Sequence, residues 1–259
     1  MSSKKRKRKE NILALICERG TMSVGALADI LDVSMQTIRR DIDALCEEEG
    51  LRRHHGRVEL NGRRLNTPFD QRADTNLASK SAIGEAATRL IPDGSTVFLS
   101  IGSTPLSVAR ALLRRKELTV ITNNLSAAMA LSEEVSNRII LPGGEVRLPD
   151  RDILGSEVLD LIDQYRADFA VFGVAGIAED GGLLDFHAAE VRVRERMQAN
   201  ARQSILVLDG SKFGRLAPAL GGNIADADHI VSDRAPEAML KAIVKKLRGR
   251  FVLVEGGSG

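Results

Sequence analysis

A helix-like stretch near the start of the chain carries the side chains best suited to bind a nucleic acid. In Val33–Leu45, the apolar residues Ile38, Ile42 and Leu45 recur at helical spacing and form one stripe. The start and the opposite face of this helix carry hydroxyl, amide and guanidinium groups from Ser34, Gln36, Thr37, Arg39 and Arg40. Groups of this kind read base edges and hold phosphates in the DNA major groove. An ordinary solvated helix face is the alternative for this helix taken alone.

Two shorter helices precede this stretch and must position it. Residues 11–19 carry apolar side chains at helical spacing and are followed by Gly20, a residue type common at helix ends. Ser23 can cap a second helix over Val24–Leu31, because a serine hydroxyl accepts the free backbone N–H groups of a helix start. Short helices joined by a tight turn predict a helix-turn-helix at about Met22–Asp41.

Basic residues dominate the segment after these helices. Two strand-like pieces, Leu51–Arg53 and Arg57–Leu60, flank Gly56 and predict a β-hairpin wing. Its basic side chains are Arg52, Arg53, His54, His55 and Arg57. Such a wing could lie along the phosphate backbone or enter the minor groove, and a plain solvated hairpin is the alternative.

The N-terminal part of the chain also carries its positive charge. Residues 1–64 contain fourteen Lys or Arg and ten Asp or Glu, whereas the whole 259-residue chain has a net charge of only +2. A basic excess in one part suits a domain that binds a polyanion. The first ten residues, with the run KKRKRK, are expected to form a solvated, disordered tail or to add phosphate contacts.

The combination of VS, TIRRD and LRRHHG between about residues 10 and 60 is specific. It resembles the N-terminal domain of the DeoR family of bacterial transcriptional regulators. The resemblance implies a winged helix-turn-helix over residues 11–60 that binds double-stranded operator DNA. Arg57 departs from the family pattern, because it stands where a second glycine usually follows HHG, and it adds a positive charge there.

The composition argues against several other kinds of protein. Hydrophobic residues make up 43% and charged residues 28%, which suits a folded chain with a sizeable core. Cys17 and Cys46 are expected to be buried free thiols, without a disulfide or a metal motif. Four His, one Tyr and no Trp argue against a metal centre or an aromatic platform, and no cofactor is expected. Without a signal peptide or a membrane-length apolar run, the expected location is the cytoplasm.

Beyond a polar linker over residues 61–79, the pattern changes to alternating strands and helices. The expected strands are Thr96–Ile101, Leu118–Thr122, Arg138–Leu141, Ala167–Val174, Ser204–Asp209 and His229–Ser232. The expected helices are Lys80–Leu90, Thr104–Leu113, Ser126–Leu131, Glu157–Asp163, Ala188–Ala201 and Pro236–Leu247. Repeated βα units predict an α/β domain over residues 80–255, with a mainly parallel sheet covered on both faces.

Five polar or glycine-rich loops lie where ligands bind such a sheet, at the carboxyl ends of its strands. They are IGSTP (101–105), TNN (122–124), PGGE (142–145), GVAGI (173–177) and DGSKFG (209–214). Gly102 allows a close backbone approach, Ser103 and Thr104 supply hydroxyls, and the helix N-terminus after them suits a phosphate. Lys212 could supply a point charge to the same phosphate. A simple capping turn and a structural lysine are the alternatives.

These loops, IGSTP, TNN, LPGGE and SKFG, resemble the sensor domain of the DeoR family, whose fold is related to that of sugar-phosphate isomerases. The resemblance implies that Gly102, Ser103, Thr104 and Lys212 hold the phosphate of an effector. It implies a second set that contacts the effector's hydroxyls or shapes the pocket: Asn123, Asn124, Gly143, Gly144, Glu145, Asp185 and Glu190. With the segments NTPFDQR and LLDFHAAEVR, the resemblance favours glycerol-3-phosphate as that effector.

A sugar-phosphate isomerase or deaminase is the enzymatic alternative. Such chemistry needs a positioned carboxylate that moves a proton between carbons. The related isomerases carry acidic residues in a loop of the DGADE kind, whereas this chain has Ala175 and Gly176 there, with Glu179 and Asp180 displaced. No GxGxxG follows a strand, and no Ser or Cys lies in a nucleophile elbow. The sequence therefore predicts a sensor and not an enzyme.

The whole pattern predicts a transcriptional repressor of a carbohydrate or polyol catabolic operon. As a homodimer or homotetramer it would present recognition helices to half-sites about one helical turn apart, or a multiple of it. The C-terminal domain would sense a phosphorylated sugar or polyol and supply the oligomer contacts. This effector would release the DNA by favouring a conformation that fits the operator poorly.

Overall fold

The structure is a computed structural model that describes residues 3–19, 21–47, 51–54, 57–60, 69–235 and 251–254. The chain folds into two compact units, one holding Met1–Asn66 and the other holding most of the chain from Thr67 onward. In the described ranges, no helix is both long enough and apolar enough to cross a membrane.

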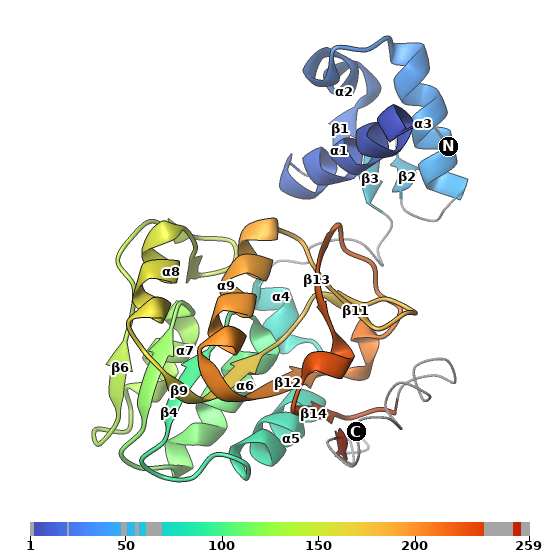
Figure 1. The fold of residues 1–259 in the computed structure, drawn as a ribbon. Coiled ribbons are helices and arrows are strands. Elements are labelled where there is room, and N and C mark those ends of the chain that lie inside the picture. The colour runs from blue at the N-terminus through green and yellow to red at the C-terminus, as the bar shows by residue number, and fades with distance from the viewer. Residues whose placement is uncertain are drawn as a thin grey trace. The chain divides into compact units, whose positions relative to one another are not determined.

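The first unit contains three helices and a small sheet (Figure 1). The helices are α1 (Ser3–Arg19), α2 (Val24–Leu31) and α3 (Met35–Glu47), and the strands are β1 (Met22–Ser23), β2 (Leu51–His54) and β3 (Arg57–Leu60). β3 is central and pairs antiparallel with both β1 and β2. The expected helices and hairpin strands are confirmed, whereas the two-residue β1 is too short to show a sequence pattern.

One apolar cluster holds these elements together. The predicted stripe of α3, made of Ile38, Ile42 and Leu45, is at most 2% exposed. It packs with Ile12 of α1 and Leu27 of α2, and the hairpin closes the cluster. The buried stripe therefore fixes the rotation of α3 about its axis and turns its polar face outward.

The basic N-terminal run is helical, so the expected disordered tail is wrong for residues 3–10. Lys9 is buried, and Nε of Arg8 donates to Oδ2 of Asp41 on α3 at 2.5 Å. The Asp41 side chain is only 2% exposed. Like charges in a row usually favour disorder, but here the run supplies the countercharge of a buried carboxylate.

The two cysteines fit their expectation only in part. Cys46 is a free thiol but is half-buried, not fully buried. Burial raises the pKa of the Cys46 thiol. The side chain of Cys17 lies outside the part of the chain that the structure describes.

The second unit is built on a seven-stranded sheet in the order β15-β14-β12-β9-β4-β5-β6. Its strands are β4 (Thr96–Leu99), β5 (Thr119–Thr122), β6 (Arg138–Ile140), β9 (Ala167–Phe172), β12 (Ala201–Leu208), β14 (His229–Ser232) and β15 (Phe251–Leu253). Every neighbouring pair runs parallel. The predicted α/β architecture and its six strands are confirmed, and β15 is an addition.

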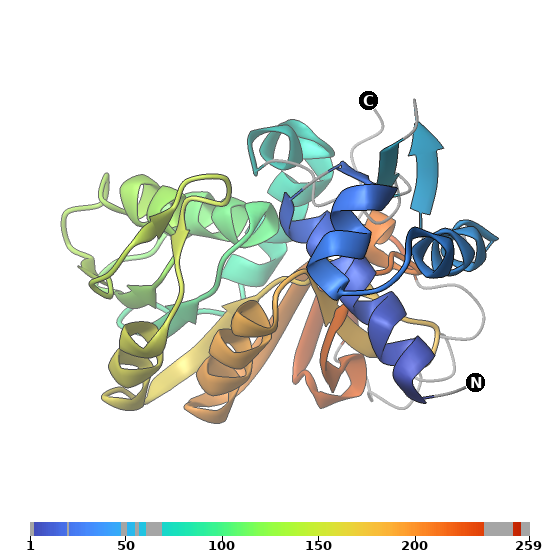
Figure 2. The ribbon, with the colours of Figure 1, turned by 90° about the horizontal axis from the view of Figure 1, so that it is seen from above.

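Helices cover both faces of this sheet. They are α5 (Leu77–Thr88), α6 (Ser103–Ala111), α7 (Leu125–Leu131), α8 (Ser156–Asp163) and α9 (Ala188–Ala199). Figure 2 shows α5 and α6 on one side of the sheet and α8 and α9 on the other. Successive residues Val97 and Phe98 of β4 enter these two opposite layers, which is why the strands read as continuous apolar runs. The helix expected at Pro236–Leu247 lies outside the described residues.

The expected linker is wrong for residues 69–79, because they are folded into the second unit. Phe69–Asp74 form α4, and α5 begins at Leu77. The Phe69 ring is 2% exposed and belongs to the core under α5 and α6. Lys80, also 2% exposed, donates its Nζ to the carbonyls of Arg72 and Thr75 at the end of α4. A single buried ring and a single buried ammonium leave no periodic pattern in the sequence, so the sequence does not predict α4.

Two small antiparallel elements come after strands of the large sheet in the chain. The β7–β8 hairpin consists of β7 (Val146–Arg147) and β8 (Asp152–Ile153) with the turn between them. A three-stranded sheet consists of β10 (Gly176–Ile177), β11 (Gly182–Asp185) and β13 (Ala219–Asn223). Strands this short carry no alternation, so the sequence does not predict them.

The Arg8–Asp41 pair provides a test of the helical N-terminal run. Asp41→Asn should lower the free energy of opening of α1 and α3 by about 2 kcal/mol, because a buried ion pair is broken while Arg8 is partly exposed. Hydrogen–deuterium exchange of amides in the full chain measures this change. Asp43→Asn is the matched control, because the Asp43 side chain is 56% exposed and its pair with Arg53 should contribute under about 1 kcal/mol. Equal exchange in the two variants would contradict the role given to Arg8 and Asp41.

Candidate functional site

Helix α3 presents a polar face that the domain itself does not use. Ser34, Gln36, Arg39 and Arg40 are exposed, and Thr37 is half-buried. Ser34 caps the helix, since its Oγ accepts the N–H of Thr37 at 3.2 Å and lies 2.9 Å from Thr37 Oγ1. Among the described residues, no ion pair or hydrogen bond engages the guanidinium groups of Arg39 and Arg40. Within the described part of the chain, two cations and one amide therefore have no partner and can meet one outside the domain.

Two basic side chains of the wing fix its position on the domain. Arg53 pairs with Asp43 of α3, and Nη2 of Arg57 donates to the Thr21 carbonyl at 2.7 Å. Arg53 and Arg57 are exposed, so these contacts leave their charges accessible. Arg57, the departure from the family pattern, thus anchors the hairpin to the turn before α2. The side chains of Arg52 and His54, and the whole of His55, lie outside the described residues.

The parallel sheet brings the ends of four neighbouring strands, β12, β9, β4 and β5, to one edge. At the end of β4, Gly102 has φ +114°, a left-handed conformation that favours glycine, and it precedes α6. Ser103 and Thr104 are buried at the helix start. No side chain of the described residues caps α6, so its first N–H groups form a suitable anion site.

Asn123 and Asn124 are anchors of the β7–β8 hairpin. Nδ2 of Asn123 donates to the Ile153 carbonyl at 2.8 Å, and the Ile153 N–H donates back to the Asn123 carbonyl at 3.0 Å. Nδ2 of Asn124 donates to the Gly102 carbonyl at 3.3 Å, and its Oδ1 caps α7 through the N–H of Ala127. These amides join three loops through backbone groups. Among the described residues, however, the buried Oδ1 of Asn123 has no hydrogen-bond partner.

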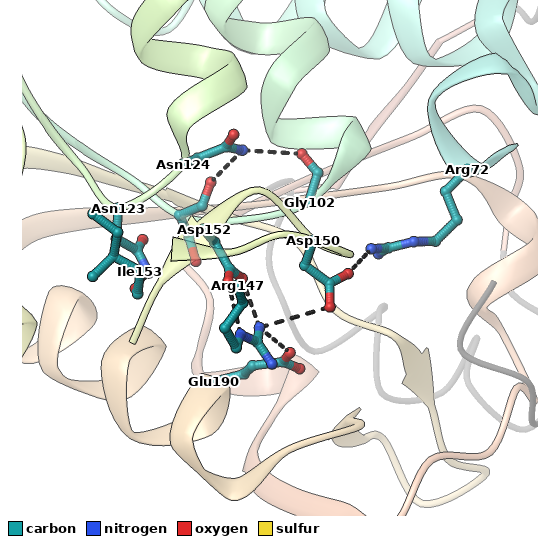
Figure 3. Close-up of polar contacts among 10 residues, drawn as sticks. Arg72, Gly102, Asn123, Asn124, Arg147, Asp150, Asp152, Ile153 and Glu190 are labelled. Atoms are coloured by element: carbon teal, nitrogen blue, oxygen red, sulfur yellow. Dashed lines mark hydrogen bonds and ion pairs between the residues drawn. The ribbon is translucent and has the colours of Figure 1, made fainter. Parts of the chain in front are cut away.

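Arg147 is the centre of a charged network that the sequence does not predict (Figure 3). Its Nε and Nη2 donate to the two carboxylate oxygens of Asp152 at 2.8 and 2.7 Å, and Nη2 also donates to Glu190 at 2.8 Å. Asp150 lies 3.8 Å from the same Nη2 and pairs on its other side with Arg72 of α4. The hairpin, α9 and α4 are thereby joined by side-chain charges.

Two of the three carboxylates expected to contact the effector, Asp185 and Glu190, are held in ion pairs. Burial, and then the charge of Asp185, raises the pKa of Glu190 to about 7, against the hydrogen bond from Arg147. Asp185 accepts the Ala175 N–H at 3.1 Å and Nε of Arg194 at 3.2 Å. Burial raises the pKa of Asp185 as well. Both groups shape the site, and part of the hydrogen-bonding capacity of each is already taken by an arginine.

Lys212 lies in a cluster of positive charge. Burial, and then the Arg215 guanidinium, lowers the pKa of its ammonium to about 7, while Asp209 opposes the shift. The charges of Lys80 and Arg72 act in the same direction as that of Arg215. No hydrogen bond or ion pair to the Nζ of Lys212 occurs within the described residues, so its charged form is poorly compensated. An anionic ligand would supply the missing countercharge.

The PGGE loop stands apart from these groups. Gly143, Gly144 and Glu145 are exposed, and Gly144 has φ +125°. In the part of the chain that is described, no hydrogen bond or ion pair joins them to Lys212 or to Gly102. Their placement gives no support to effector contacts.

Four further residues of the site escape sequence reasoning: Arg72, Arg147, Asp150 and Asp152. Arg72 and Asp150 are 78 positions apart, and Arg147 and Glu190 are 43 apart. Local spacing cannot show such pairs. The dense run of opposite charges in RLPDRD, at residues 147–152, is the one visible signal.

Comparisons with known proteins agree with both units. Residues 8–64 match the DeoR-like helix-turn-helix domain, and residues 75–234 match the DeoR C terminal sensor domain. The chain belongs to the DeoR family. This DeoR-family protein is 40% identical to the glycerol-3-phosphate regulon repressor of Escherichia coli (strain K12), over 93% of this chain and 96% of that protein. It is also 40% identical to the transcriptional repressor CsqR of the same organism, over 95% and 94%.

Solved structures show only a loose likeness to the DeoR-family protein. Ribose 5-phosphate isomerase A from Methanocaldococcus jannaschii aligns with 52% of this chain and 53% of its own at 19% identity, with a TM-score of 0.39. The delta subunit of eIF2B from Chaetomium thermophilum aligns with 76% and 61% at 15% identity, with a TM-score of 0.43. At these scores the likeness carries no argument about function.

The charge environment of Lys212 in this DeoR-family protein can be measured directly. Arg215→Gln should raise the pKa of Lys212 above its value of about 7, because a neighbouring like charge is removed. NMR titration of ¹³C-methylated lysines in the full chain measures the shift. Arg114→Gln is the matched control, since Arg114 is 73% exposed and pairs with Glu85. If the pKa of Lys212 is the same in both variants, the expected effect of the Arg215 charge on Lys212 is contradicted.

Proposed function

We propose that this DeoR-family protein is a transcriptional repressor that a phosphorylated metabolite releases from its operator. The observation that carries the proposal is the half-buried, poorly compensated ammonium of Lys212 at the sheet edge that also bears the uncapped start of α6. Both features call for an anion, and a phosphate monoester provides two negative charges at neutral pH. The unengaged polar face of α3 supplies the output to DNA.

Glycerol-3-phosphate is the effector we propose, because a relative at 40% identity over nearly the whole chain carries that metabolite in its name. Its phosphate would accept hydrogen bonds from the α6 N–H groups, from the Ser103 and Thr104 hydroxyls and from the Lys212 ammonium. Its two hydroxyls would meet the polar groups around Glu190 and Asp185. The regulated genes would then serve the uptake or breakdown of a polyol or carbohydrate.

On DNA, α3 would enter the major groove. Gln36, Arg39 and Arg40 would contact base edges and phosphates, and the basic wing would follow the backbone. A cytoplasmic homodimer or homotetramer would place two such helices on adjacent half-sites. Occupancy of the sensor would favour a state in which the two helices no longer match the half-site spacing.

A catalytic role is disfavoured by the state of the two buried carboxylates. Glu190, whose pKa of about 7 would suit proton transfer, is bonded to Arg147, and Asp185 is bonded to Arg194. An arginine that donates to a carboxylate stabilises the charged form and so opposes the uptake of a proton from a substrate. The proposal is therefore a sensor without turnover, and a sugar phosphate incubated with the protein should be recovered unchanged.

Arg40→Ala tests the DNA side of the proposal. The variant should bind the operator duplex at least about tenfold more weakly, because one base-edge or phosphate contact is lost from the groove. Fluorescence anisotropy at several salt concentrations measures affinity and the number of ionic contacts, and hydrogen exchange verifies that α3 stays folded. Arg114→Ala is the control for loss of an exposed arginine. Unchanged specific affinity in Arg40→Ala would contradict the assigned reading face.

Lys212→Ala tests the sensor side. The variant should keep operator affinity but should lose most of its affinity for glycerol-3-phosphate and most of the operator release. In the wild type, ligand binding raises the pKa of Lys212 from about 7, so binding takes up a proton and affinity should fall as the pH rises above 7. Calorimetry in buffers of different ionisation enthalpy measures the uptake. Lys116→Ala, which removes a lysine 58% exposed, should leave both affinity and pH profile unchanged, and a Lys212→Ala profile like the wild type would contradict the assignment.

A further inference from the structure

Arg72 of α4 belongs to two charged clusters at once. Its guanidinium pairs with Asp150 in the β7–β8 hairpin. Its positive charge also lowers the pKa values of Lys80, Lys212 and Arg215, so it lies within electrostatic reach of the Lys212 loop. The Nε of Arg72 is buried and has no hydrogen-bond partner among the residues that the structure describes. Arg72 therefore has an unused donor near the place where the anion is proposed to bind.

Besides the packing of Phe69 in the core, polar contacts hold helix α4 at both of its ends. Lys80 donates to the carbonyls of Arg72 and Thr75 at its end. At its start, the N–H of Phe69 donates to the Pro149 carbonyl of the hairpin at 3.4 Å, and Asp70 pairs with Arg151 at 2.8 Å. In chain order, α4 is the first described element after the wing strand β3. Helix α4 is thus the described helix of the sensor that is nearest in sequence to the DNA-binding unit.

The hairpin forms the second half of this connection. Arg147 ties it to Glu190, and Asn123 ties it to the end of β5. Asp150 lies between Arg72 and Arg147, at 3.8 Å from Nη2 of Arg147 (Figure 3). If Arg72 left, Asp150 would still have a cation to approach. The pair can therefore exchange partners without leaving a buried charge alone, a condition that a two-state element needs.

We propose that Arg72 is the effector-responsive residue of the sensor, drawn away from Asp150 by the phosphate of the bound effector so that α4 is released from the β7–β8 hairpin. The inference rests on the proposed function. A phosphate dianion competes well for a guanidinium, because it accepts two parallel hydrogen bonds and carries more charge than a carboxylate. The buried Nε would gain its missing acceptor in the exchange. Release of α4 would then lower operator affinity.

This mechanism makes the two partners of the pair behave differently when they are changed. Breaking the pair from either side imitates the effector, so Arg72→Gln and Asp150→Asn should both bind the operator weakly without any ligand. The two variants should differ in their affinity for the effector. Arg72→Gln loses a ligand contact and should bind it more weakly, whereas Asp150→Asn removes the competitor for Arg72 and should bind it more tightly.

The experiment combines calorimetry with operator-binding anisotropy on the full chain, with glycerol-3-phosphate as the ligand and inorganic phosphate as a second probe. Asp150→Asn should bind glycerol-3-phosphate about tenfold more tightly than the wild type, a factor within the usual range of allosteric coupling. Arg72→Gln should bind it at least about tenfold more weakly. Both should show operator affinity close to that of the ligand-saturated wild type. Glu85→Gln, which breaks the exposed Glu85–Arg114 pair, is the matched control and should behave like the wild type.

The possible results distinguish a failure of the role of Arg72 from a failure of the proposed function. If the wild type responds to glycerol-3-phosphate but Asp150→Asn binds it no more tightly and represses normally, the role of Arg72 is overturned and the proposed function stands. If the wild type binds neither probe, the proposed function fails and the inference falls with it. Thermal unfolding of each variant distinguishes a released α4 from a misfolded sensor, since release leaves the unfolding midpoint of the large sheet in place. Opposite shifts of effector affinity in two folded variants would support the inference.

Discussion

The carboxylate of Asp152 has no exposure to solvent, and its burial determines how the ligand-facing end of the sensor is built. A buried charge must be paired and fully hydrogen-bonded, and here both oxygens accept from Arg147. Nη2 of Arg147 also pairs with Glu190 and lies within ion-pair distance of Asp150. Asp150 in turn sets the position of Arg72. One buried ion pair thus locates the β7–β8 hairpin, the start of α9 and helix α4 relative to the ends of the parallel strands.

The parts of the molecule that follow local patterns could be predicted from the sequence. Apolar residues at i, i+4 and i+7 placed α3 correctly, and continuous apolar runs placed six strands, because each signal depends on neighbours in the chain. The parts that are held by contacts between residues distant in the sequence could not be predicted in this way. Helix α1 extends into the basic run because Arg8 meets Asp41, 33 positions away, and α4 exists because Phe69 enters the core and Lys80 binds its last carbonyls. For the candidate site, the sequence predicted the edge of the sheet where the polar loops lie, and Lys212 as a phosphate contact stays a prediction. The sequence could not tell that Asn123 and Asn124 hold loops together.

The same edge of a parallel sheet can serve catalysis or sensing, and the difference lies in which groups are free. Raised pKa values are common at catalytic sites, so Glu190 and Asp185 invite an enzymatic interpretation. In this molecule, however, each carboxylate accepts a hydrogen bond from an arginine that is itself fixed by other acceptors. Arg194, for example, also donates to the Gly221 carbonyl at 2.8 Å. Fixed ion pairs make a rigid wall for a ligand, and rigidity is what a binding site needs when no bond is to be broken.

The ligand-free state of the sensor carries an electrostatic cost, and this cost is what makes a switch possible. The pKa values of Lys80, Lys212 and Arg215 are all lowered, with burial as the largest cause in each. Each lowered pKa means that the positive charge is disfavoured there. A dianionic ligand removes part of that cost only where it is bound, so it stabilises whichever arrangement brings the cations closest to it. Because Arg72 can belong either to the hairpin or to this cluster, the arrangement that the ligand prefers is also the one in which α4 loses its hold on Asp150. A ligand that interacted equally with both arrangements would bind without signalling.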